Sequence, residues 1–195
     1  MNQETREEGS TFTSNSPMAT ALLFLLLLGA TLIFLNSRGT YDRRVFERWM
    51  ATTAEHGLVQ GYAESKWDYP PLAYAILHAS NQIVSTFQMT TFHALKIAIF
   101  FFLVLTSAVF WLWTRDPVAT AVLHLALLFN SLGLAYVDVF VGPAVLLAFW
   151  ALHERHMVLF AICFTVACLI KWQPMILAPF LAVYVMDVRN FRWRN

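Results

Sequence analysis

Apolar runs constrain this chain more than any other feature. They cover residues 21–35, 94–113, 118–136, 139–152, 157–170 and 175–186. A single run of about 10–14 apolar residues is compatible with the core helix of a soluble protein. Five apolar runs in close succession between residues 94 and 186, however, leave no soluble surface that could cover them. The pattern predicts an all-α polytopic membrane protein with about six transmembrane helices.

Composition excludes several other classes of protein. Hydrophobic residues make up 58% of the chain and charged residues 13%, and the mean hydropathy is +0.57. A soluble domain carries about a quarter charged residues. The net charge is +1, so there is no basic field to attract a nucleic acid. We therefore exclude a soluble globular domain, a disordered chain and a nucleic-acid partner.

The polar ends divide the chain into three parts. Residues 1–20 are polar and rich in Ser and Thr, which predicts a disordered tail. Residues 21–187 form the predicted membrane domain, and residues 188–195 form a basic cytoplasmic tail. A cleaved signal peptide is the alternative for the first run. The acidic tail before this run and the lack of a small-x-small cleavage site favour an uncleaved span.

Lysine and arginine in the short loops predict the orientation. Cationic side chains fall on alternate connections, at Arg115, Arg155, Arg189, Arg192 and Arg194. If these connections are cytoplasmic, the segment 36–92 and the turns at Asp138 and Lys171 are external. The segment 36–92 itself holds five Lys or Arg, which argues the other way, but it also holds five acids.

The external segment 36–92 is expected to contain two amphipathic helices. The first follows Asp42 and ends at Gly57, with an apolar stripe at Val45, Phe46, Trp49, Met50 and Thr53 or Ala54. The second opens at Pro70 or Pro71 and lies in the outer interface. Its expected apolar stripe is Leu72, Ile76, Ala79, Ile83 and Phe87.

Charged and polar residues gather on the predicted external face. They are Asp42, Asp68, Asp138, Lys171 and Gln173, together with Arg38, Arg43, Arg44 and Arg48. Each has a structural alternative: Asp42 and Asp68 suit helix caps, whereas Asp138 and Lys171 could reach water from helix ends. Carboxylates that abstract a proton, beside cations that hold a phosphate, are what glycosyl transfer from a lipid-phosphate donor needs.

Other chemistry-bearing residues give weaker signals. His153 and His156 are spaced for a metal on one helix face, but no third ligand accompanies them, and a solvated loop is favoured. Cys163 and Cys168 lie inside an apolar run and are interpreted as packing residues. The sequence contains no phosphate-binding glycine loop and no nucleophile elbow.

Two motifs of the external segment resemble the first external loop of the GT-C glycosyltransferases. They are Tyr41-Asp42-x6-Trp49 and Asp68-Tyr69-Pro70-Pro71-Leu72. The likeness is strongest to the dolichyl-phosphate-glucose glucosyltransferases of asparagine-linked glycosylation and their bacterial relatives. Tyr136-Val137-Asp138 and Lys171-Trp172-Gln173-Pro174 are similar to later external turns of that family. The four landmarks occur in the family's order.

The resemblance implies a GT-C-like module with Asp42 as the catalytic base. Asp42 would deprotonate an acceptor sugar hydroxyl, which attacks the anomeric carbon of a hexose on a polyprenyl- or dolichyl-phosphate, with inversion. Lys171 and Arg48 would stabilise the charge on the departing lipid phosphate. The other implied substrate-binding residues are Asp68, Tyr69, Asp138 and Gln173. The acceptor would be a glycolipid or lipid-linked oligosaccharide, and neither a metal nor a cofactor is expected.

Alternatives from other classes stay open. Members of this family continue for several more spans, so the chain is a minimal module, a truncated product or one part of a split enzyme. A non-catalytic relative that binds a lipid-linked glycan or a partner subunit is the main alternative. A small transporter fits less well because the polar residues cluster at one face. The expected location is a prokaryotic plasma membrane or the endoplasmic reticulum membrane.

Overall fold

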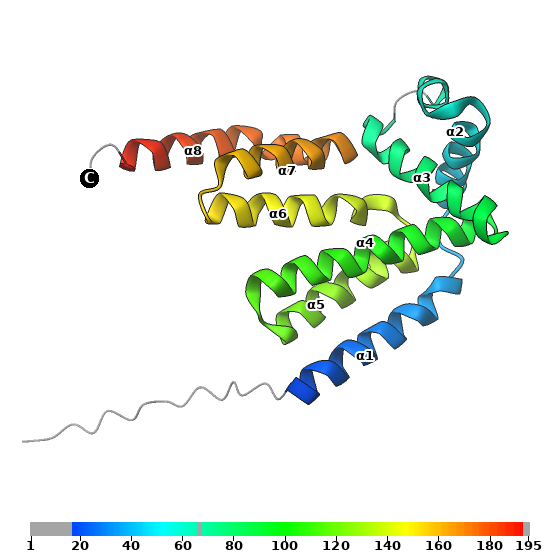
Figure 1. The fold of residues 1–195 in the computed structure, drawn as a ribbon, viewed down its shortest axis with the longest axis horizontal. Coiled ribbons are helices and arrows are strands. Elements are labelled where there is room, and N and C mark those ends of the chain that lie inside the picture. Colours follow the sequence, from blue (N-terminus) through cyan, green and yellow to red (C-terminus); the bar gives the residue numbers. More distant parts are fainter. Residues whose placement is uncertain (1–16, 66–67, 193–195) are drawn as a thin grey trace, which may run out of the picture.

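The computed structural model describes residues 17–65 and 68–192, and these residues form helices without any strand (Figure 1). The long and medium helices are α1 (Pro17–Ile33), α2 (Arg43–Glu64), α3 (Pro71–Phe87), α4 (Thr91–Thr114), α5 (Pro117–Leu128), α6 (Gly142–His153), α7 (Met157–Ile170) and α8 (Ala178–Arg192). Short 3₁₀ segments are η1 (Phe34–Asn36), η3 (Val137–Val141) and η4 (Gln173–Leu177), and η2 (Phe129–Gly133) is a π-helical turn.

Helices α1, α4, α5, α6 and α7 lie side by side as a bundle, α8 is joined to it through η4, and α2 and α3 gather at one end (Figure 1). The chain runs up and down, so α6 packs on α7 and on α4, and α1 packs on α5. Consequently the end of α1, the beginning of α4 and the η3 and η4 segments all lie at the end that carries α2 and α3. We call this the α2–α3 end.

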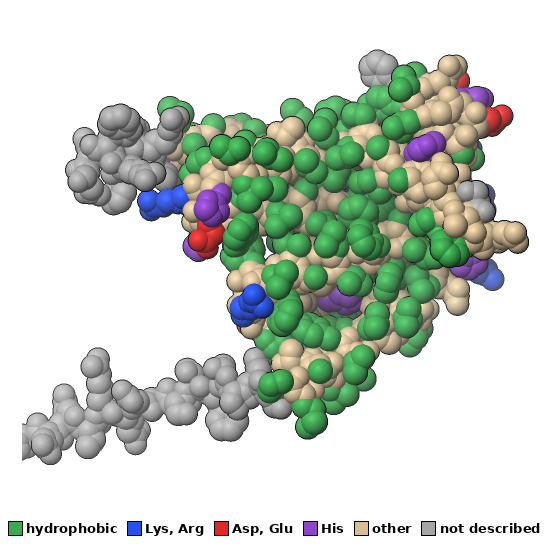
Figure 2. All heavy atoms as spheres, viewed as in Figure 1, with side chains coloured by type: hydrophobic (Ala, Val, Ile, Leu, Met, Phe, Trp, Pro, Cys, Tyr) green, Lys and Arg blue, Asp and Glu red, His purple; other side chains and the backbone are tan. Residues whose placement is uncertain are grey.

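Two helical segments are long and apolar enough to cross a membrane, namely Pro17–Asn36 and Thr91–Thr114. Shorter apolar helical segments cover Pro117–Gly133, Val137–His153, Met157–Ile170 and Gln173–Met186. The visible flank of the bundle is covered by hydrophobic side chains, whereas charged and histidine side chains appear mainly toward its two ends (Figure 2). The predicted all-helical fold is therefore confirmed, together with two helices of membrane-spanning length.

Local signals explain where several helices begin. The Asp116 carboxylate accepts hydrogen bonds from the backbone N–H groups of Val118 and Ala119, at 2.9 and 3.0 Å, and Pro117 opens α5. Helix α3 begins at Pro71, which confirms the predicted opening at Pro70 or Pro71. The expected tail before residue 17 lies outside the described residues, and α1 already begins at Pro17.

Gly57 interrupts α2 as the sequence predicts. Its φ of 80° and ψ of 164° are non-helical, so residues 58–64 form a second helical arm. This arm folds back on the first, where a Cβ on Gly61 would lie 2.7 Å from the Cα of Thr53. The His56 Nδ1 and Glu64 Oε2 atoms, 2.6 Å apart, join the two arms.

The protein core buries a side of α3 that differs from its predicted apolar stripe. Its buried residues are Ala73, Tyr74, Leu77 and Ser80, whereas Ala79 and Phe87 from the expected stripe are exposed. The reason is packing against α2, where the Tyr74 ring lies 4.8 Å from the Trp49 ring and 5.0 Å from the Tyr62 ring. Aromatic contacts therefore determine which side of this helix faces the core.

Candidate functional site

Tyr69, Asp138 and Lys171 meet at the α2–α3 end and form a cluster that we call the Asp138 cluster. Tyr69 precedes α3, Asp138 lies in η3, and Lys171 follows the last residue of α7. The Tyr69 hydroxyl donates to Asp138 Oδ1 at 3.2 Å, across a separation of 69 residues. Lys171 Nζ forms an ion pair with the same oxygen. One carboxylate oxygen thus joins three segments that are far apart in the sequence.

Aromatic rings hold the Tyr69 side chain in place. The Tyr69 ring lies edge-on to Trp49 and Phe46 of α2, with centroid distances of 5.4 and 6.2 Å. Lys171 Nζ lies 5.9 Å from the centroid of the Tyr69 ring, within the range of a cation–π interaction. The same ring therefore contacts both α2 and the ammonium of the cluster. Trp49 from the sequence motif serves here as a buried packing residue.

The electrostatics of the cluster keep Tyr69 protonated. Burial raises the pKa of Tyr69 above its ordinary value of 10.0, and the negative charges of Asp138 and Asp42 raise it further. Asp138 is engaged by a phenol and an ammonium, so its carboxylate is fixed as an acceptor. Its contacts are those of a residue that orients Tyr69 and Lys171.

Asp42 occupies the position expected of a helix cap but does not act as one. It immediately precedes α2, yet its φ of −60° and ψ of −26° are helical and its side chain makes no capping hydrogen bond. The residue is exposed. Its charge reaches Tyr69, which places it on the side of the Asp138 cluster. An exposed carboxylate without a capping role is available for proton transfer.

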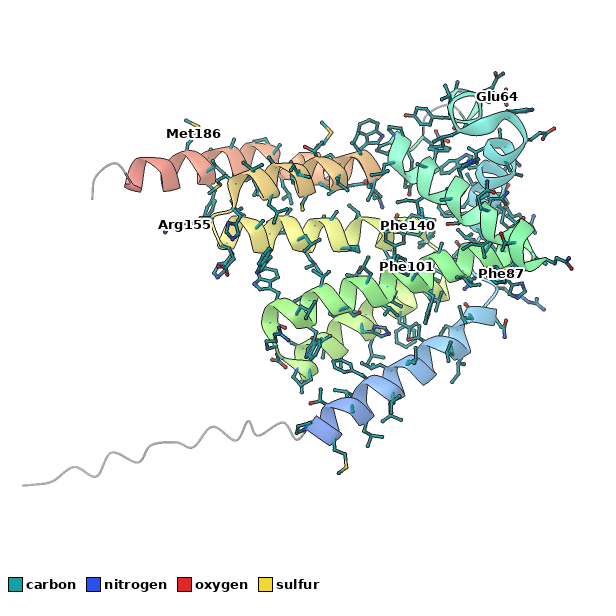
Figure 3. All side chains as sticks on the ribbon, viewed as in Figure 1. Glu64, Phe87, Phe101, Phe140, Arg155 and Met186 are labelled. Atoms are coloured by element: carbon teal, nitrogen blue, oxygen red, sulfur yellow. The ribbon has the colours of Figure 1, made fainter. Side chains whose placement is uncertain are left out.

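The remaining predicted site residues lie at the same end but outside the cluster. Asp68 is exposed, and its charge acts on the Tyr74 hydroxyl. Arg48 is exposed on α2 and Gln173 is exposed at the first position of η4. Within the described ranges, neither Arg48 nor Gln173 takes part in a hydrogen bond or ion pair with the cluster. Figure 3 shows the side chains at this end, with Glu64 and Phe87 labelled there and Arg155 at the opposite end.

Lys96 is a buried charge that the sequence analysis did not assign to the site. It has no exposed surface, and its ammonium donates to Ser37 Oγ at 2.7 Å, to the Phe34 carbonyl at 3.3 Å and to the Leu132 carbonyl. These bonds tie the end of α1 to η2, the segments that lead to Asp42 and Asp138 respectively. A charge near the beginning of an apolar run was the available signal.

His124 joins three helices inside the bundle. Its Nε2 lies 2.7 Å from Thr31 Oγ1 on α1, and its Nδ1 lies 2.8 Å from Ser107 Oγ on α4. It borders an apolar hollow of about 310 Å³ between α1, α4 and α5. Because the contacts of His124 are side chains on neighbouring helices, its role here is to hold the bundle together.

Two exposed histidines, His153 and His156, lie at the opposite end of the bundle. His153 and His156 flank the turn between α6 and α7, and no group of three or more potential ligands occurs among the residues that the structure describes. His153 lies against Trp113 and His156 against Trp150, with ring centroids 6.5 and 6.0 Å apart.

The fold and site together define a helical bundle with a charged, aromatic-lined cluster at one end. Comparison of the chain with protein-family models, with curated proteins and with solved structures finds no match in any of the three.

Proposed function

We propose that this protein is a multi-pass membrane glycosyltransferase of the GT-C type. It transfers a hexose from a polyprenyl- or dolichyl-phosphate donor to a glycolipid or lipid-linked oligosaccharide. In this proposal the six apolar helical segments cross the membrane, and the α2–α3 end faces the external or lumenal side. The membrane is a prokaryotic plasma membrane or that of the endoplasmic reticulum.

The observation that carries the proposal is the meeting of the four sequence landmarks at one end of the bundle. Four separate segments supply Asp42, Tyr69, Asp138 and Lys171. Tyr69 is linked to the other three, by a hydrogen bond to Asp138, by a ring contact with Lys171 and by the effect of the Asp42 charge on its pKa. The motifs that resemble GT-C loops thus lie together, on the side where two external helices cover the bundle. Such a convergence is what a transfer site requires of them.

Asp42 is the proposed base because it is the exposed carboxylate of this group and makes no capping hydrogen bond. It takes the proton of the acceptor hydroxyl while the oxygen attacks the anomeric carbon. The bond from the anomeric carbon to the phosphate oxygen breaks, and the lipid phosphate leaves with the electron pair. Besides this proton transfer, orientation of the two substrates in the site supplies much of the rate.

Lys171 remains able to contact the donor phosphate although it is paired with Asp138. An ammonium has three N–H donors, and the ion pair with Asp138 occupies one side of it. The Lys171 side chain is 15% exposed, so a donor phosphate would have to enter the site to contact the ammonium. Arg48, which is exposed on α2, is the second proposed cation. Asp68, Tyr69, Asp138 and Gln173 complete the proposed substrate contacts.

The test is sugar transfer by the full chain reconstituted in lipid. Radiolabelled polyprenyl-phosphate-glucose and polyprenyl-phosphate-mannose are offered together with a membrane lipid extract as acceptor. Asp42→Asn should lower transfer by about 100-fold or more, because a general base is lost. Glu154→Gln, which alters an exposed carboxylate at the opposite end, is the matched control and should retain wild-type transfer.

Thermal unfolding separates catalysis from capping. Asp42→Asn and Asp42→Ala should unfold at the wild-type temperature, because the Asp42 side chain makes no capping bond. A well-folded wild-type chain that transfers neither sugar would count against the enzyme and favour a non-catalytic relative that binds a glycan or a partner subunit. Equal activity of Asp42→Asn and wild type would refute the role of Asp42.

A further inference from the structure

A second charged feature lies where the chain leaves α1 and enters α2. A hollow of about 580 Å³ is lined by Arg38, Gly39, Thr40, Tyr41, Arg43 and Arg44. Three of these six residues are arginines, and none is acidic. We call it the arginine hollow.

The backbone beneath the arginine hollow is fixed. Gly39 has a φ of +69°, and a Cβ at this position would lie 2.6 Å from the Cβ of Ala135. Only glycine therefore fits the turn. The next residue, Thr40, donates its backbone N–H to the Leu134 carbonyl at 2.9 Å. The arginines are thus presented on a turn that is anchored to the bundle.

Arg43 is held by three contacts. Its guanidinium lies 4.9 Å from the centroid of Phe92, its Nη1 donates to the Arg38 carbonyl at 2.9 Å, and its Nε lies 3.5 Å from Glu47 Oε1. The ammonium of Lys96 lies 5.7 Å from the same Phe92 ring and donates to neutral acceptors only. Arg43 and Lys96 therefore share the Phe92 ring, and Glu47 is the carboxylate that pairs with Arg43.

Arg38 and Arg44 are the free cations of the arginine hollow. Both residues are exposed, and the guanidinium of Arg44 lies 5.7 Å from the Tyr41 ring. The backbone of Arg38 accepts from Arg43, whereas its side chain makes no hydrogen bond or ion pair within the part of the chain that the structure describes. Exposed guanidinium groups such as these can donate paired hydrogen bonds to the oxygens of a phosphate.

We infer that the arginine hollow binds the phosphate headgroup of a membrane lipid. The arginine hollow is placed where a lipid headgroup would lie if α1 crosses a membrane. Its residues follow directly after α1 and η1, and the end of α1 exposes Leu32 and Ile33, which suit contact with lipid chains. Tyr41 is 73% exposed beside it, as expected for a side chain at the level of lipid headgroups. The inference needs α1 to lie in a membrane but does not depend on glycosyl transfer.

Native mass spectrometry of the full chain in neutral detergent tests the inference. The probes are dioleoyl phosphatidic acid, dioleoyl phosphatidylcholine and inorganic phosphate. R38Q/R44Q should bind phosphatidic acid about tenfold more weakly than wild type, because two cations at a headgroup site are removed. R38K/R44K keeps both charges but loses the planar guanidinium groups, so it should bind phosphatidic acid more weakly than wild type and more tightly than R38Q/R44Q. If the glutamine variant is unstable, undiminished binding by R38K/R44K would contradict recognition by the guanidinium groups.

The chain offers a closely matched control pair at the opposite end. Arg115 lies 5.4 Å from the Trp111 ring, as Arg44 lies over Tyr41, and Arg155 is exposed as Arg38 is. R115Q/R155Q should therefore bind phosphatidic acid as wild type does. An equal loss in this variant would overturn the inference, as would equal binding of phosphatidylcholine. Inorganic phosphate that binds as tightly as phosphatidic acid would overturn the lipid source of the ligand.

Discussion

Asp138 and Lys171 differ in how much of each side chain reaches solvent, with 41% exposed for Asp138 and 15% for Lys171. Removing one partner leaves the other charge unpaired, and the penalty grows with burial. Asp138→Asn leaves a mostly buried ammonium, whereas Lys171→Gln leaves a carboxylate that still accepts from Tyr69. We expect Asp138→Asn to lower the free energy of unfolding by about 2 kcal/mol and Lys171→Gln by about 1 kcal/mol.

Denaturant unfolding of the detergent-solubilised chain measures both changes. The double variant Asp138→Asn/Lys171→Gln should lose less than the sum of the single losses, because the two residues contact each other. Additive losses, or a larger loss for Lys171→Gln than for Asp138→Asn, would contradict the ion pair as the structure places it.

The raised pKa of Tyr69 predicts that the folded chain loses stability at high pH. A tyrosine is neutral when protonated, and the pKa of Tyr69 is raised above 10.0 in the folded chain. The folded chain therefore keeps a proton that the unfolded chain loses. The stabilising contribution is complete below pH 10 and is lost as the pH rises through the folded-state pKa. The pKa of Tyr74 is also raised by burial and adds to this trend.

Thermal unfolding between pH 8 and pH 11 checks this prediction. Wild type should lose stability above about pH 10, and Tyr69→Phe should show a shallower loss because its ring carries no titrating hydroxyl. Ultraviolet absorbance of the ionised phenol reports tyrosinate directly. Identical alkaline profiles of wild type and Tyr69→Phe would show that Tyr69 is not protected in the folded chain.

At the scale of elements, the helical hairpin of α2 depends on Gly57. Its backbone, at φ 80° and ψ 164°, lies in a region that is essentially restricted to glycine, although nothing lies within 4 Å of the position that a Cβ would occupy. Gly57→Ala should therefore cost about 1–3 kcal/mol through backbone strain alone. Gly29→Ala is the control, because Gly29 also has nothing within 4 Å of its Cβ position but is helical.

Chemical unfolding and helical circular dichroism distinguish the two glycine variants. Gly29→Ala should be neutral or slightly stabilising, since alanine favours helix over glycine by about 1 kcal/mol. If Gly57→Ala were as stable as wild type, the break between the two arms of α2 would not require a positive φ.

Helix α3 has apolar side chains on two different sides. Leu72, Ile76 and Ile83 from the predicted stripe are only partly buried at the edge of the core. The fully buried side, with Tyr74 and Leu77, faces the aromatic residues of α2 and the bundle. If α3 lies at the membrane interface, as proposed, the predicted stripe is the side that contacts lipid.

At the scale of the whole molecule, the arrangement predicts opposite exposure of the two bundle ends in a membrane. Gln88 and Gln173 are exposed at the α2–α3 end, and Glu154 is exposed at the other end. In sealed vesicles of a chain with Cys163 and Cys168 replaced by Ala, single cysteines at these three positions report the topology. Gln88→Cys and Gln173→Cys should react with an impermeant thiol reagent from one side, and Glu154→Cys from the other.

Positions 88 and 154 are separated by α4, α5 and α6, so an odd number of crossings lies between them in the proposed topology. Labelling of Gln88→Cys and Glu154→Cys from the same side would contradict crossings by the shorter apolar helices. Labelling of Gln173→Cys from the side of Glu154→Cys would contradict crossing by α7.

Periodicity and loop charge, which are local properties, were enough for the helical fold, the break at Gly57 and the start of α3. They also predicted which polar residues share one end, because an up-and-down chain places alternate connections together. Asp42, Asp68, Asp138 and Lys171 could be named in this way, whereas Tyr69 was named only through the resemblance of its motif. The role of glycosyltransferase that the resemblance implies for them stays a prediction.

Tertiary structure alone decided the partners of these residues. Apolar periodicity cannot distinguish a side that meets lipid from one that meets protein, so the buried side of α3 was missed. The pairing of Asp138 with Lys171 and the three acceptors of Lys96 join segments far apart in the chain. Such contacts depend on how the helices are rotated against one another, which is set by side-chain packing across the whole bundle and not by any local pattern.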